Sequence, residues 1–347
     1  MSHSASLAHI RFWSLLFAAL ALAWGVLARQ WSETWWWLAL LDQVPALPFL
    51  LLPLLLAVLA ARRRKGGWVV WNLGAALTFT VFQAGAVLPR AERLPGGSPL
   101  TLLTLNTDFA SAPPPALAAL VARERADIVT LQEGLDHGGQ AQPYEAALRR
   151  AFPGWTVLRH DELLTLTRLP LLGSRTVTFP QTPHSVLVAR VRAAGQEVTV
   201  VNTHLPTLGL WRGASDRALG RTLAQRTEHQ LAARREFPGV MARLLGQEAG
   251  PLLLAGDLNA PPRGELHRDL TALGLRDAFA QAGHWFGLTH HARAPYARID
   301  YVWLRGAQAE DVQALPDRLS DHRALVVRLR LPPAVEDGPP PDGAPSS

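Results

Sequence analysis

Long apolar runs without charge occupy most of the first 88 residues of this 347-residue chain. Residues 12–28 and 67–88 contain no charged side chain, and residues 36–60 contain one acid and three prolines that predict a bend. A helix of about 20 apolar residues crosses a hydrocarbon core of roughly 30 Å. We therefore expect about three transmembrane helices near residues 12–28, 36–60 and 67–88, which form a membrane anchor over residues 1–88.

The residues that flank these runs predict an orientation. Eight of the twelve tryptophans precede residue 72, and amphipathic rings favour a membrane interface. The basic cluster at residues 62–65 lies between the second and third runs, and short basic loops stay cytoplasmic. With three spans, the N-terminus lies in the cytoplasm and the chain after Leu88 forms an extracytoplasmic domain of a multi-pass cell-membrane protein. An even number of spans would place that domain in the cytoplasm instead.

Two other readings of the apolar runs stay open. A cleaved signal peptide would explain the first run but not the two that follow it. A buried helical hairpin inside a soluble fold would explain a pair of runs. Composition adds little, because the chain after residue 93 carries 26 basic and 25 acidic residues, and a nucleic-acid-binding domain usually has a basic excess. Cysteine is absent, which excludes disulfides and a cysteine-ligated zinc site.

The rest of the chain has the pattern of a layered α/β domain. Residues 89–99 are rich in Pro and Gly and predict a linker, and residues 332–347 predict a disordered tail. Between them, residues 100–331 alternate short β-type runs with helical patterns. Strands are expected at residues 100–105, 127–131, 185–191, 197–201, 251–255, 299–304 and 324–331, and helices at residues 115–125, 143–151, 222–245 and 266–273.

Acids, amides and imidazoles recur at the ends of these expected strands. One isolated Asp at such a place is usually a turn or helix-cap residue. Turn chemistry does not explain six strand ends in one domain, and clustered carboxylates require a cation. Oxygen-rich ligands favour Mg²⁺ or Mn²⁺ over zinc. The residues are Asn106, Asp108, Glu133, Asn202, His204, Asp257, Asn259, Asp300, Asp321 and His322.

These residues lie in short motifs that resemble the signature blocks of the endonuclease/exonuclease/phosphatase superfamily. The resemblance implies a four-layer α/β sandwich of two mixed β-sheets flanked by helices. It also implies a metal-dependent hydrolase of phosphoester bonds, in a group that includes DNase I-like nucleases and phosphatases. The blocks are Asn106, the LQE that ends at Glu133, NTHL at 202–205, GDLNAPP at 256–262, RIDYVW at 298–303 and SDHRAL at 320–325.

The resemblance assigns the metal to one group of residues. Glu133 would be the principal Mg²⁺ ligand, with help from Asn106. Asp108 and Asp321 are further ligand candidates, and Asp108 is the less certain because the acid at its place varies in the family.

A second group would carry out the reaction. His322, oriented by Asp300, would be the general base that activates water. Asp257 and Asn259 would position the nucleophile and the phosphoryl oxygens. His204 would donate to a phosphate oxygen as negative charge grows in the transition state.

The chain departs from the family pattern in two places. Leu105 stands where many members have Trp, which changes packing more than chemistry. The stretch LTRLP resembles the family's Ser-Arg-x-Pro block with Thr167 in place of Ser, and it makes Arg168 a candidate for substrate binding.

Substrate choice is expected to depend on residues 205–237, which contain six arginines and three acids. One reading is a solvated helix face. The other is a lip on the membrane, in which Leu208, Leu210 and Trp211 enter the interface and arginines such as Arg212 bind phosphate groups. The lip would suit a lipid phosphate or pyrophosphate. The architecture is similar to that of membrane-tethered bacterial members linked to glycopeptide resistance and polyprenyl pyrophosphate hydrolysis.

The sequence therefore predicts a membrane-anchored phosphoesterase whose partners are the lipid bilayer and a phosphate-containing substrate. The alternative is an extracytoplasmic DNase or RNase that acts on nucleic acid. A third hypothesis, a catalytically inactive membrane-tethered binding module, conflicts with the presence of all the expected acids.

Overall fold

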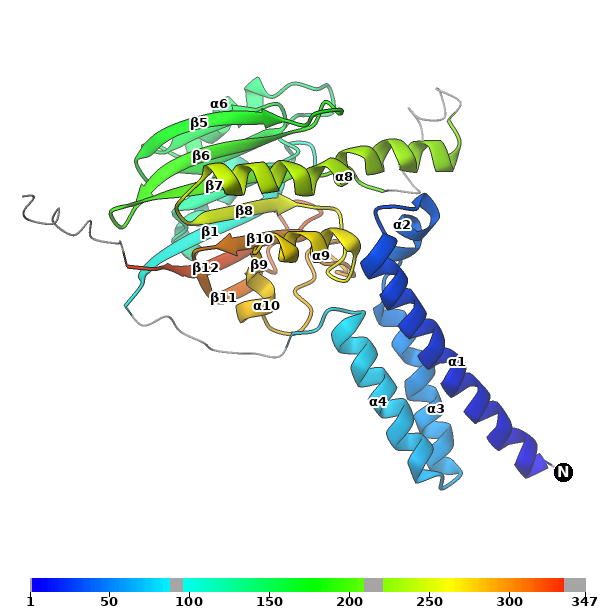
Figure 1. The fold of residues 1–347 in the computed structure, drawn as a ribbon. Helices are drawn as coiled ribbons and strands as arrows, with labels where there is room; N and C mark the ends of the chain where they lie inside the picture. Colours follow the sequence, from blue (N-terminus) through cyan, green and yellow to red (C-terminus); the bar gives the residue numbers. More distant parts are fainter. Residues whose placement is uncertain (1, 88–95, 209–220, 334–347) are drawn as a thin grey trace, which may run out of the picture.

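The computed structural model describes residues 2–87, 96–208 and 221–333, and it separates a group of N-terminal helices from a β-rich domain (Figure 1). The helices project from one end of that domain (Figure 1). They are α1 (Ser2–Trp31), α2 (Trp36–Asp42), the 3-10 helix η1 (Leu47–Leu50), α3 (Leu51–Arg62) and α4 (Gly66–Phe82).

The expectation of about three transmembrane helices requires correction. One helix is long and apolar enough to cross a membrane, over Leu7–Trp31. The second expected span is broken between Trp36–Asp42 and Leu47–Arg62, which meet at 68° and make a second candidate only if the bent pair counts as one span. Pro45 and Pro48 lie at the break and lack the amide hydrogens that a continuous helix needs. The third, α4, has 17 residues and ends at Phe82 rather than residue 88.

Two six-stranded mixed sheets form the domain. The first has the order β11-β12-β1-β2-β4-β3, in which only the β1/β2 pair is parallel. Its strands are β1 (Ser98–Asn106), β2 (Ile128–Gln132), β3 (Thr156–His160), β4 (Leu163–Thr167), β11 (Gln308–Ala314) and β12 (Leu325–Leu331).

The second sheet has the order β5-β6-β7-β8-β10-β9, in which only the β7/β8 pair is parallel. Its strands are β5 (Leu171–Thr178), β6 (Ser185–Ala193), β7 (Gln196–His204), β8 (Leu252–Asp257), β9 (Arg276–Asp277) and β10 (Asp300–Arg305). Strand β1 begins two residues inside the expected linker, most of which lies outside the described residues, as does the tail from residue 334.

Helices cover both outer faces, so the expected four-layer order of two mixed sheets flanked by helices is present. Helices α5 (Pro114–Glu124) and α6 (Gln142–Ala151) pack on the first sheet through Leu117 and Leu148. Helices α8 (Leu223–Gln247) and α9 (Glu265–Ala272) pack on the second through Phe237 and Leu266. The short helix α10 (Ala278–Ala282) lies beside the core between the sheets.

The core between the sheets uses every second residue of its strands. Leu102 of β1, Val200 of β7, Leu253 and Ala255 of β8, and Val302 of β10 all belong to it. Residues between these positions face the outer helices instead. Since side chains alternate across a strand, the same face continues to the polar residue that ends or begins each strand.

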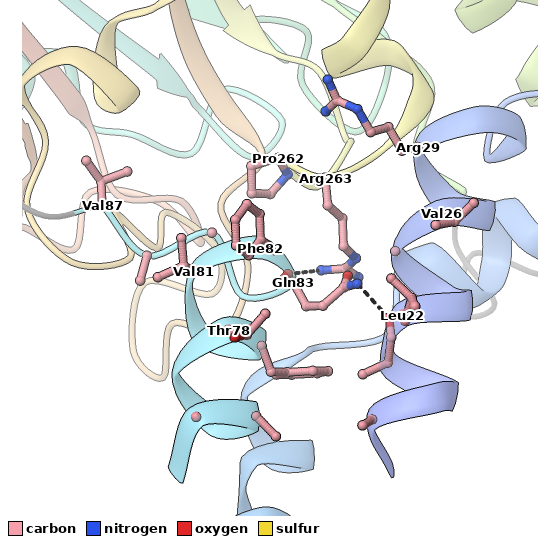
Figure 2. Close-up of a pocket in the computed structure, with 18 of the residues that line it drawn as sticks. Leu22, Val26, Arg29, Thr78, Val81, Phe82, Gln83, Val87, Pro262 and Arg263 are labelled. Carbon is pink, nitrogen blue, oxygen red and sulfur yellow. Dashed lines mark hydrogen bonds between the residues drawn. The ribbon is translucent and has the colours of Figure 1, made fainter. Parts of the chain in front are cut away.

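Two buried ion pairs attach the N-terminal helices to the domain. Glu33 pairs with Arg234 of α8, and Asp42 pairs with Arg263. Arg263 also donates to the Gln83 carbonyl at 2.8 Å (Figure 2). The membrane lip expected within residues 205–237 is wrong in part. Leu208 does not lie at a membrane interface but is buried against Ala39 of α2. Arg234 is likewise buried and does not face a membrane. Leu210, Trp211 and Arg212 lie outside the described residues.

Candidate active site

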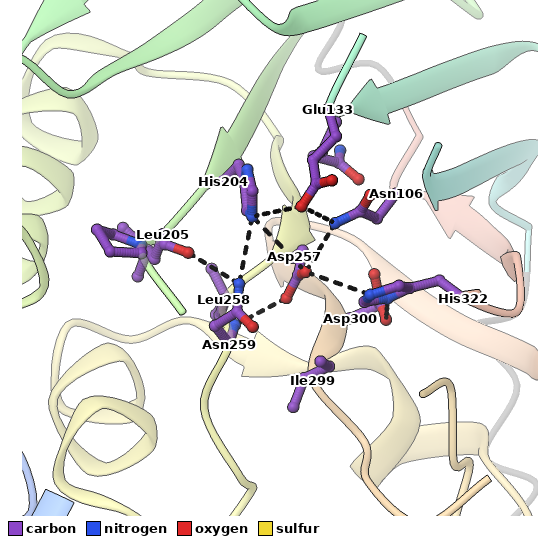
Figure 3. A network of polar contacts seen from close by, with 12 residues as sticks. Asn106, Glu133, His204, Leu205, Asp257, Leu258, Asn259, Ile299, Asp300 and His322 are labelled. Carbon is purple, nitrogen blue, oxygen red and sulfur yellow. Dashed lines mark hydrogen bonds and ion pairs between the residues drawn. The ribbon is translucent and has the colours of Figure 1, made fainter. Parts of the chain in front are cut away.

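Five predicted site residues at strand ends meet at one edge of the sandwich, together with Asn259 and His322 (Figure 3). The parallel pairs β1/β2 and β7/β8 all end at this edge, because each pair runs in one direction. Asp300 begins the antiparallel strand β10 and stands opposite Asp257. The other residues brought here are Asn106 at the end of β1, Glu133 directly after β2 and His204 at the end of β7.

Asn106 joins the two sheets at this edge. Its Nδ2 donates to Glu133 Oε1 at 3.2 Å and to Asp257 Oδ2 at 3.0 Å. Glu133 has a φ of 54°, in the left-handed region that non-glycine residues seldom adopt. Such backbone strain is held by surrounding structure and often occurs at functional sites. The turn aims the carboxylate toward Asn106 and His204, whose Nε2 lies 3.8 Å from Glu133 Oε1.

His322 forms a buried pair with Asp300. Its Nδ1 lies 2.8 Å from Asp300 Oδ2, and its Nε2 lies 3.8 Å from Asp257 Oδ2. Burial alone lowers the pKa of His322, but the carboxylates of Asp300, Asp257 and Asp321 outweigh it and raise the pKa to about 10. Burial and the neighbouring Asp300 raise the pKa of Asp257. The geometry is that of an imidazole held in one orientation with its second nitrogen directed at the site.

His204 occupies the other side of the cluster. Its Nδ1 lies 2.9 Å from Glu162 Oε1, and its Nε2 lies 3.2 Å from Asn259 Nδ2. Burial opposes protonation, but Glu162, Asp257 and Glu133 raise the pKa of His204 to about 9. An imidazole that keeps its proton at neutral pH suits a donor to phosphate oxygens. The Asn259 amide is fixed by a bond to the Leu205 carbonyl at 2.9 Å.

Asp108 and Asp321 lie at the rim of the cluster. Burial, with Asp321 and Glu133 nearby, raises the pKa of Asp108. Burial would also raise the pKa of Asp321, but its contact with His290 and the nearby His322 lower it. The His290 Nε2 is 3.6 Å from Asp321 Oδ2.

The donor set fits a hard divalent cation. The cationic partners of Asp257 and Asp300 within the described part of the chain are imidazoles, with no arginine or lysine. Asp300 Oδ1 is buried without a hydrogen-bond partner among the described residues. One atom each from Asp257, Asp300 and His322 lie within 4.8 Å of one another, as do atoms of His290, Asp321 and His322. Carboxylate oxygens of this kind suit Mg²⁺ or Mn²⁺. Asn106 directs Nδ2 at Glu133 and Asp257, while its Oδ1 accepts from the Asp108 N–H at 3.0 Å.

Arg168 does not join the cluster. It follows β4 and pairs with Asp127 at 2.5 Å, at the start of β2 and a full strand length from Glu133. Strand β4 runs antiparallel to β2, so its last residue lies at the opposite edge of the sheet. The prediction of a substrate-binding role for Arg168 is therefore wrong in its placement. The same prediction for Arg212 concerns a residue outside the described ranges.

Sequence reasoning missed several supporting residues. Glu162 lies in the tight turn between β3 and β4, two strands that were not expected. His290 packs its ring 4.7 Å from that of His322 and comes from a loop without a strand-end signal. Gln132 donates to Asn202 Oδ1 at 2.7 Å between the sheets just beneath the cluster. Asn202 was among the strand-end candidates, whereas Gln132 was missed, although it is a polar residue at the end of an apolar strand.

Comparison with known proteins identifies the domain. A sequence profile described as the Endonuclease/Exonuclease/phosphatase family matches residues 103–322. No curated protein sequence matches the chain.

Solved structures with the same fold share little sequence with the chain. One is an endonuclease/exonuclease/phosphatase from Bacteroides vulgatus, with 18% identity, a TM-score of 0.53, and coverage of 68% of this chain and 100% of that one. A family protein from Bacteroides thetaiotaomicron has 14% identity and a TM-score of 0.53, with coverage of 70% and 97%. A functionally unknown conserved protein from Enterococcus faecalis has 17% identity and a TM-score of 0.50, with coverage of 67% and 100%. The shared part is the sandwich fold.

Proposed function

The chain belongs to the endonuclease/exonuclease/phosphatase family and is a metal-dependent hydrolase of phosphoester bonds; from this premise we propose that it hydrolyses a lipid-linked phosphate ester or pyrophosphate at a membrane surface. The observation that carries the chemical part is the His322–Asp300 pair at 2.8 Å inside a cluster of carboxylates and amides. The observation that carries the membrane part is the exposed apolar surface of the helices beside that cluster.

His322 is the group that takes a proton from the attacking water. Its Nδ1 is held by Asp300, so Nε2 is the nitrogen available to the water. Asn259 and His204 lie on the other side of Asp257 and provide N–H donors for phosphoryl oxygens. A bound divalent cation supplies positive charge that stabilises the phosphoryl oxygens and offsets the carboxylates that hold a proton on His322.

The surface of the N-terminal helices supports a membrane location. Only 17% of the apolar window in α1 is buried, whereas the core helix of a soluble protein is mostly buried. Leu22, Leu77 and Phe82 are 69%, 65% and 72% exposed. Exposed apolar surface on this scale requires a partner or a bilayer. We therefore assign α1 as a membrane span with the α3–α4 hairpin packed against it, and a signal sequence as the alternative for α1.

Aromatic residues near the start and at the end of the apolar run in α1 support the span. Trp13 and Trp31 are 45% and 39% exposed. They are 18 residues apart in the sequence, or about 27 Å along a helix at 1.5 Å per residue. Trp31 stacks on Trp35, and Trp35 on Trp37, at the end nearest the domain. This spacing matches the roughly 30 Å thickness of a hydrocarbon core flanked by aromatic belts.

Basic residues support the orientation. The loop between α3 and α4 contains the cluster at residues 62–65, and it points away from the domain with the N-terminus (Figure 1). Arg11 lies 6.0 Å from the centroid of the Trp68 ring, which brings the start of α4 beside the start of α1. The concentration of basic residues at this end supports a cytoplasmic location for it. The catalytic domain is then extracytoplasmic.

A groove between α1, α4 and the domain supports a lipid-linked substrate (Figure 2). Its volume is about 1020 Å³, and apolar residues such as Leu22, Val26 and Phe82 line most of it. Pro262 and Arg263 close its domain end. They follow Asn259 by three and four residues, so the groove ends beside the catalytic loop. A hydrocarbon chain in this groove would leave its phosphate near the domain.

The test is hydrolysis by the detergent-solubilised full chain with Mg²⁺, Mn²⁺ or EDTA. Polyprenyl pyrophosphate, phosphatidic acid, a sugar phosphate and duplex DNA are compared, and His322→Ala and Glu133→Ala are assayed beside Arg168→Ala as the matched surface control. We expect metal-dependent release of phosphate from a lipid substrate that both site variants abolish and the control keeps. Robust DNA cleavage without lipid turnover would favour the nuclease instead, and no turnover of any substrate would favour an inactive binding module.

A further inference from the structure

The turn between α1 and α2 reaches the catalytic loop through one buried arginine. Glu33 in this turn accepts bonds from Nε and Nη2 of Arg234 at 2.7 and 2.5 Å. Only 8% of the Glu33 side chain and 1% of the Arg234 side chain are exposed. A forked pair of this kind holds the guanidinium plane in one orientation.

The remaining nitrogen of Arg234 binds the catalytic loop. Its Nη1 donates to the carbonyl of Leu258 at 3.1 Å and to that of Asn259 at 2.7 Å. Gln43, which follows α2, donates to the same Asn259 carbonyl at 3.3 Å. Two side chains thus hold the backbone of a residue whose amide lies 3.2 Å from His204 Nε2, and one of them comes from the N-terminal region.

Asn259 has a left-handed backbone conformation. Its φ is 49°, a value that Asn adopts more readily than most residues with a Cβ but that is still less favourable than a right-handed or extended one. The surrounding bonds to its carbonyl, its amide side chain and its N–H hold it there. Loss of one of these bonds should let the loop relax away from His204 and Asp257.

A second ion pair between the same two regions provides a natural control. Asp42 and Arg263 are as well buried, with 3% and 7% of their side chains exposed. Arg263 donates to Asp42 and to the carbonyls of Val44 and Gln83, all of which belong to the N-terminal region. This pair therefore attaches the helices without a bond to the Asn259 carbonyl.

We propose that Glu33 is a positioning residue of the active site, which acts through Arg234 to hold Asn259 in its catalytic conformation. The N-terminal helices are then part of the catalytic apparatus as well as an anchor. The effect of Glu33 on kcat rests on the proposed function. The effect of Glu33 on hydrogen–deuterium exchange does not, because that measurement concerns only the conformation of the loop at residues 256–262.

The first experiment compares Glu33→Gln with Asp42→Asn in the full chain in detergent. Hydrogen–deuterium exchange of the peptide that covers residues 256–262 is measured together with Tm. Both variants break a buried ion pair and should lower Tm to a similar degree. We expect at least tenfold faster exchange in this peptide for Glu33→Gln and less than twofold for Asp42→Asn. Equal changes in the two variants, or no change in either, overturn the proposal.

The second experiment separates position from stability. The double variant Glu33→Met/Arg234→Met replaces the pair with apolar side chains, which often restores stability at buried ion pairs. With bis(p-nitrophenyl) phosphate and Mn²⁺ as the probe, kcat should stay at least tenfold below wild type even where Tm recovers, because the Asn259 carbonyl still lacks its shorter bond, from Arg234, and keeps only the one from Gln43. Recovery of kcat together with Tm would assign the pair a purely structural role.

Failure of the proposed reaction has a different signature. If the wild-type chain does not cleave the probe or any lipid phosphate, the proposed function fails. The exchange measurement still decides the role of Glu33 in that case.

Discussion

Two buried aspartates on either side of β10 differ in what neutralises them. Asp277 stands opposite Trp303 of that strand and pairs with Arg298 at 2.7 Å. Asp257 stands opposite Asp300, which precedes Trp303 by three residues in β10. Its cationic partners among the described residues are the imidazoles of His204 and His322, each at 3.8 Å. Burial opposes ionisation of both, but Arg298 and His267 lower the pKa of Asp277 to about 2, whereas the pKa of Asp257 is raised.

The difference distinguishes a structural acid from a functional one. A buried carboxylate with an arginine is neutralised by the protein itself. A buried carboxylate beside other carboxylates is left for a cation or a proton to neutralise, and such perturbed groups cluster at functional sites. The N-terminal interface, with Glu33–Arg234 and Asp42–Arg263, belongs to the first kind, and the strand-end cluster belongs to the second.

The largest effect is expected from His322→Ala in the cluster. Loss of the general base should lower kcat by about 10⁴-fold, which is about 5.4 kcal/mol of barrier. In saturating Mg²⁺, Tm should change by only a few degrees, because the bound cation would offset the loss of the imidazole's positive charge beside Asp257 and Asp300. Steady-state kinetics and a thermal melt of the same preparation test this. A large loss of Tm with a small loss of kcat would place His322 with the structural residues.

Asp277→Asn should lower stability strongly and leave kcat nearly unchanged. It leaves Arg298 buried without its carboxylate, and removal of one partner of a buried pair costs roughly 3–5 kcal/mol. Denaturant unfolding should show that loss, while kcat per folded molecule stays within twofold. Because the folded pKa lies below the ordinary value of 3.8, the stabilisation from Asp277 is present above pH 4 and lost as the pH falls toward 2. The Asn variant should therefore be less sensitive than wild type in this window.

A divalent metal should stabilise the fold through the cluster. At a Mg²⁺ concentration of about 100 times Kd, binding adds about 2.7 kcal/mol. Glu133→Gln should abolish the difference between Tm in Mg²⁺ and Tm in EDTA, whereas Glu145→Gln on the surface of α6 should keep it. An equal metal effect in all three proteins would show that the ion binds elsewhere.

Asp257→Asn should raise stability in EDTA while it removes activity. The raised pKa means that the ionised form is disfavoured in the fold, so a neutral isostere at pH 7 relieves that cost. The gain should be smaller than the magnesium effect, under about 1 kcal/mol. A melt in EDTA at pH 7 decides it, and a lower Tm for the variant would contradict the comparison with Asp277.

The smallest effect is expected from Arg168→Ala. Its ion pair with Asp127 is half-exposed at the arginine, and surface pairs contribute under about 1 kcal/mol. Both kcat and KM should stay within twofold of wild type. A marked rise in KM would bring Arg168 back into substrate binding and show that the substrate extends to the far edge of the sheet.

Local patterns predicted the strands that end or begin at the cluster, and they missed β3, β4, β5, β9 and β11, although the run in β4 is buried and largely apolar. Strands β1, β7 and β8 are apolar and end in a polar residue, so each was visible alone. Strand β9 has two residues, and β5 is largely exposed at a sheet edge. Such strands exist because a neighbour provides hydrogen-bonding groups, which a single sequence does not display.

The amino-acid sequence by itself determined a layered α/β domain, the polar strand ends and the apolar character of the N-terminal helices. These three follow from local alternation or local hydrophobicity, which the order of residues specifies. The arrangement as a two-sheet sandwich was implied only by the resemblance of the motifs to a known family. Only the tertiary structure decided that Arg168 lies at the edge opposite the cluster and that Glu33 reaches Asn259 through Arg234. Strand direction and contacts between residues about 200 positions apart come from packing of the whole chain, and local pattern carries no information about them.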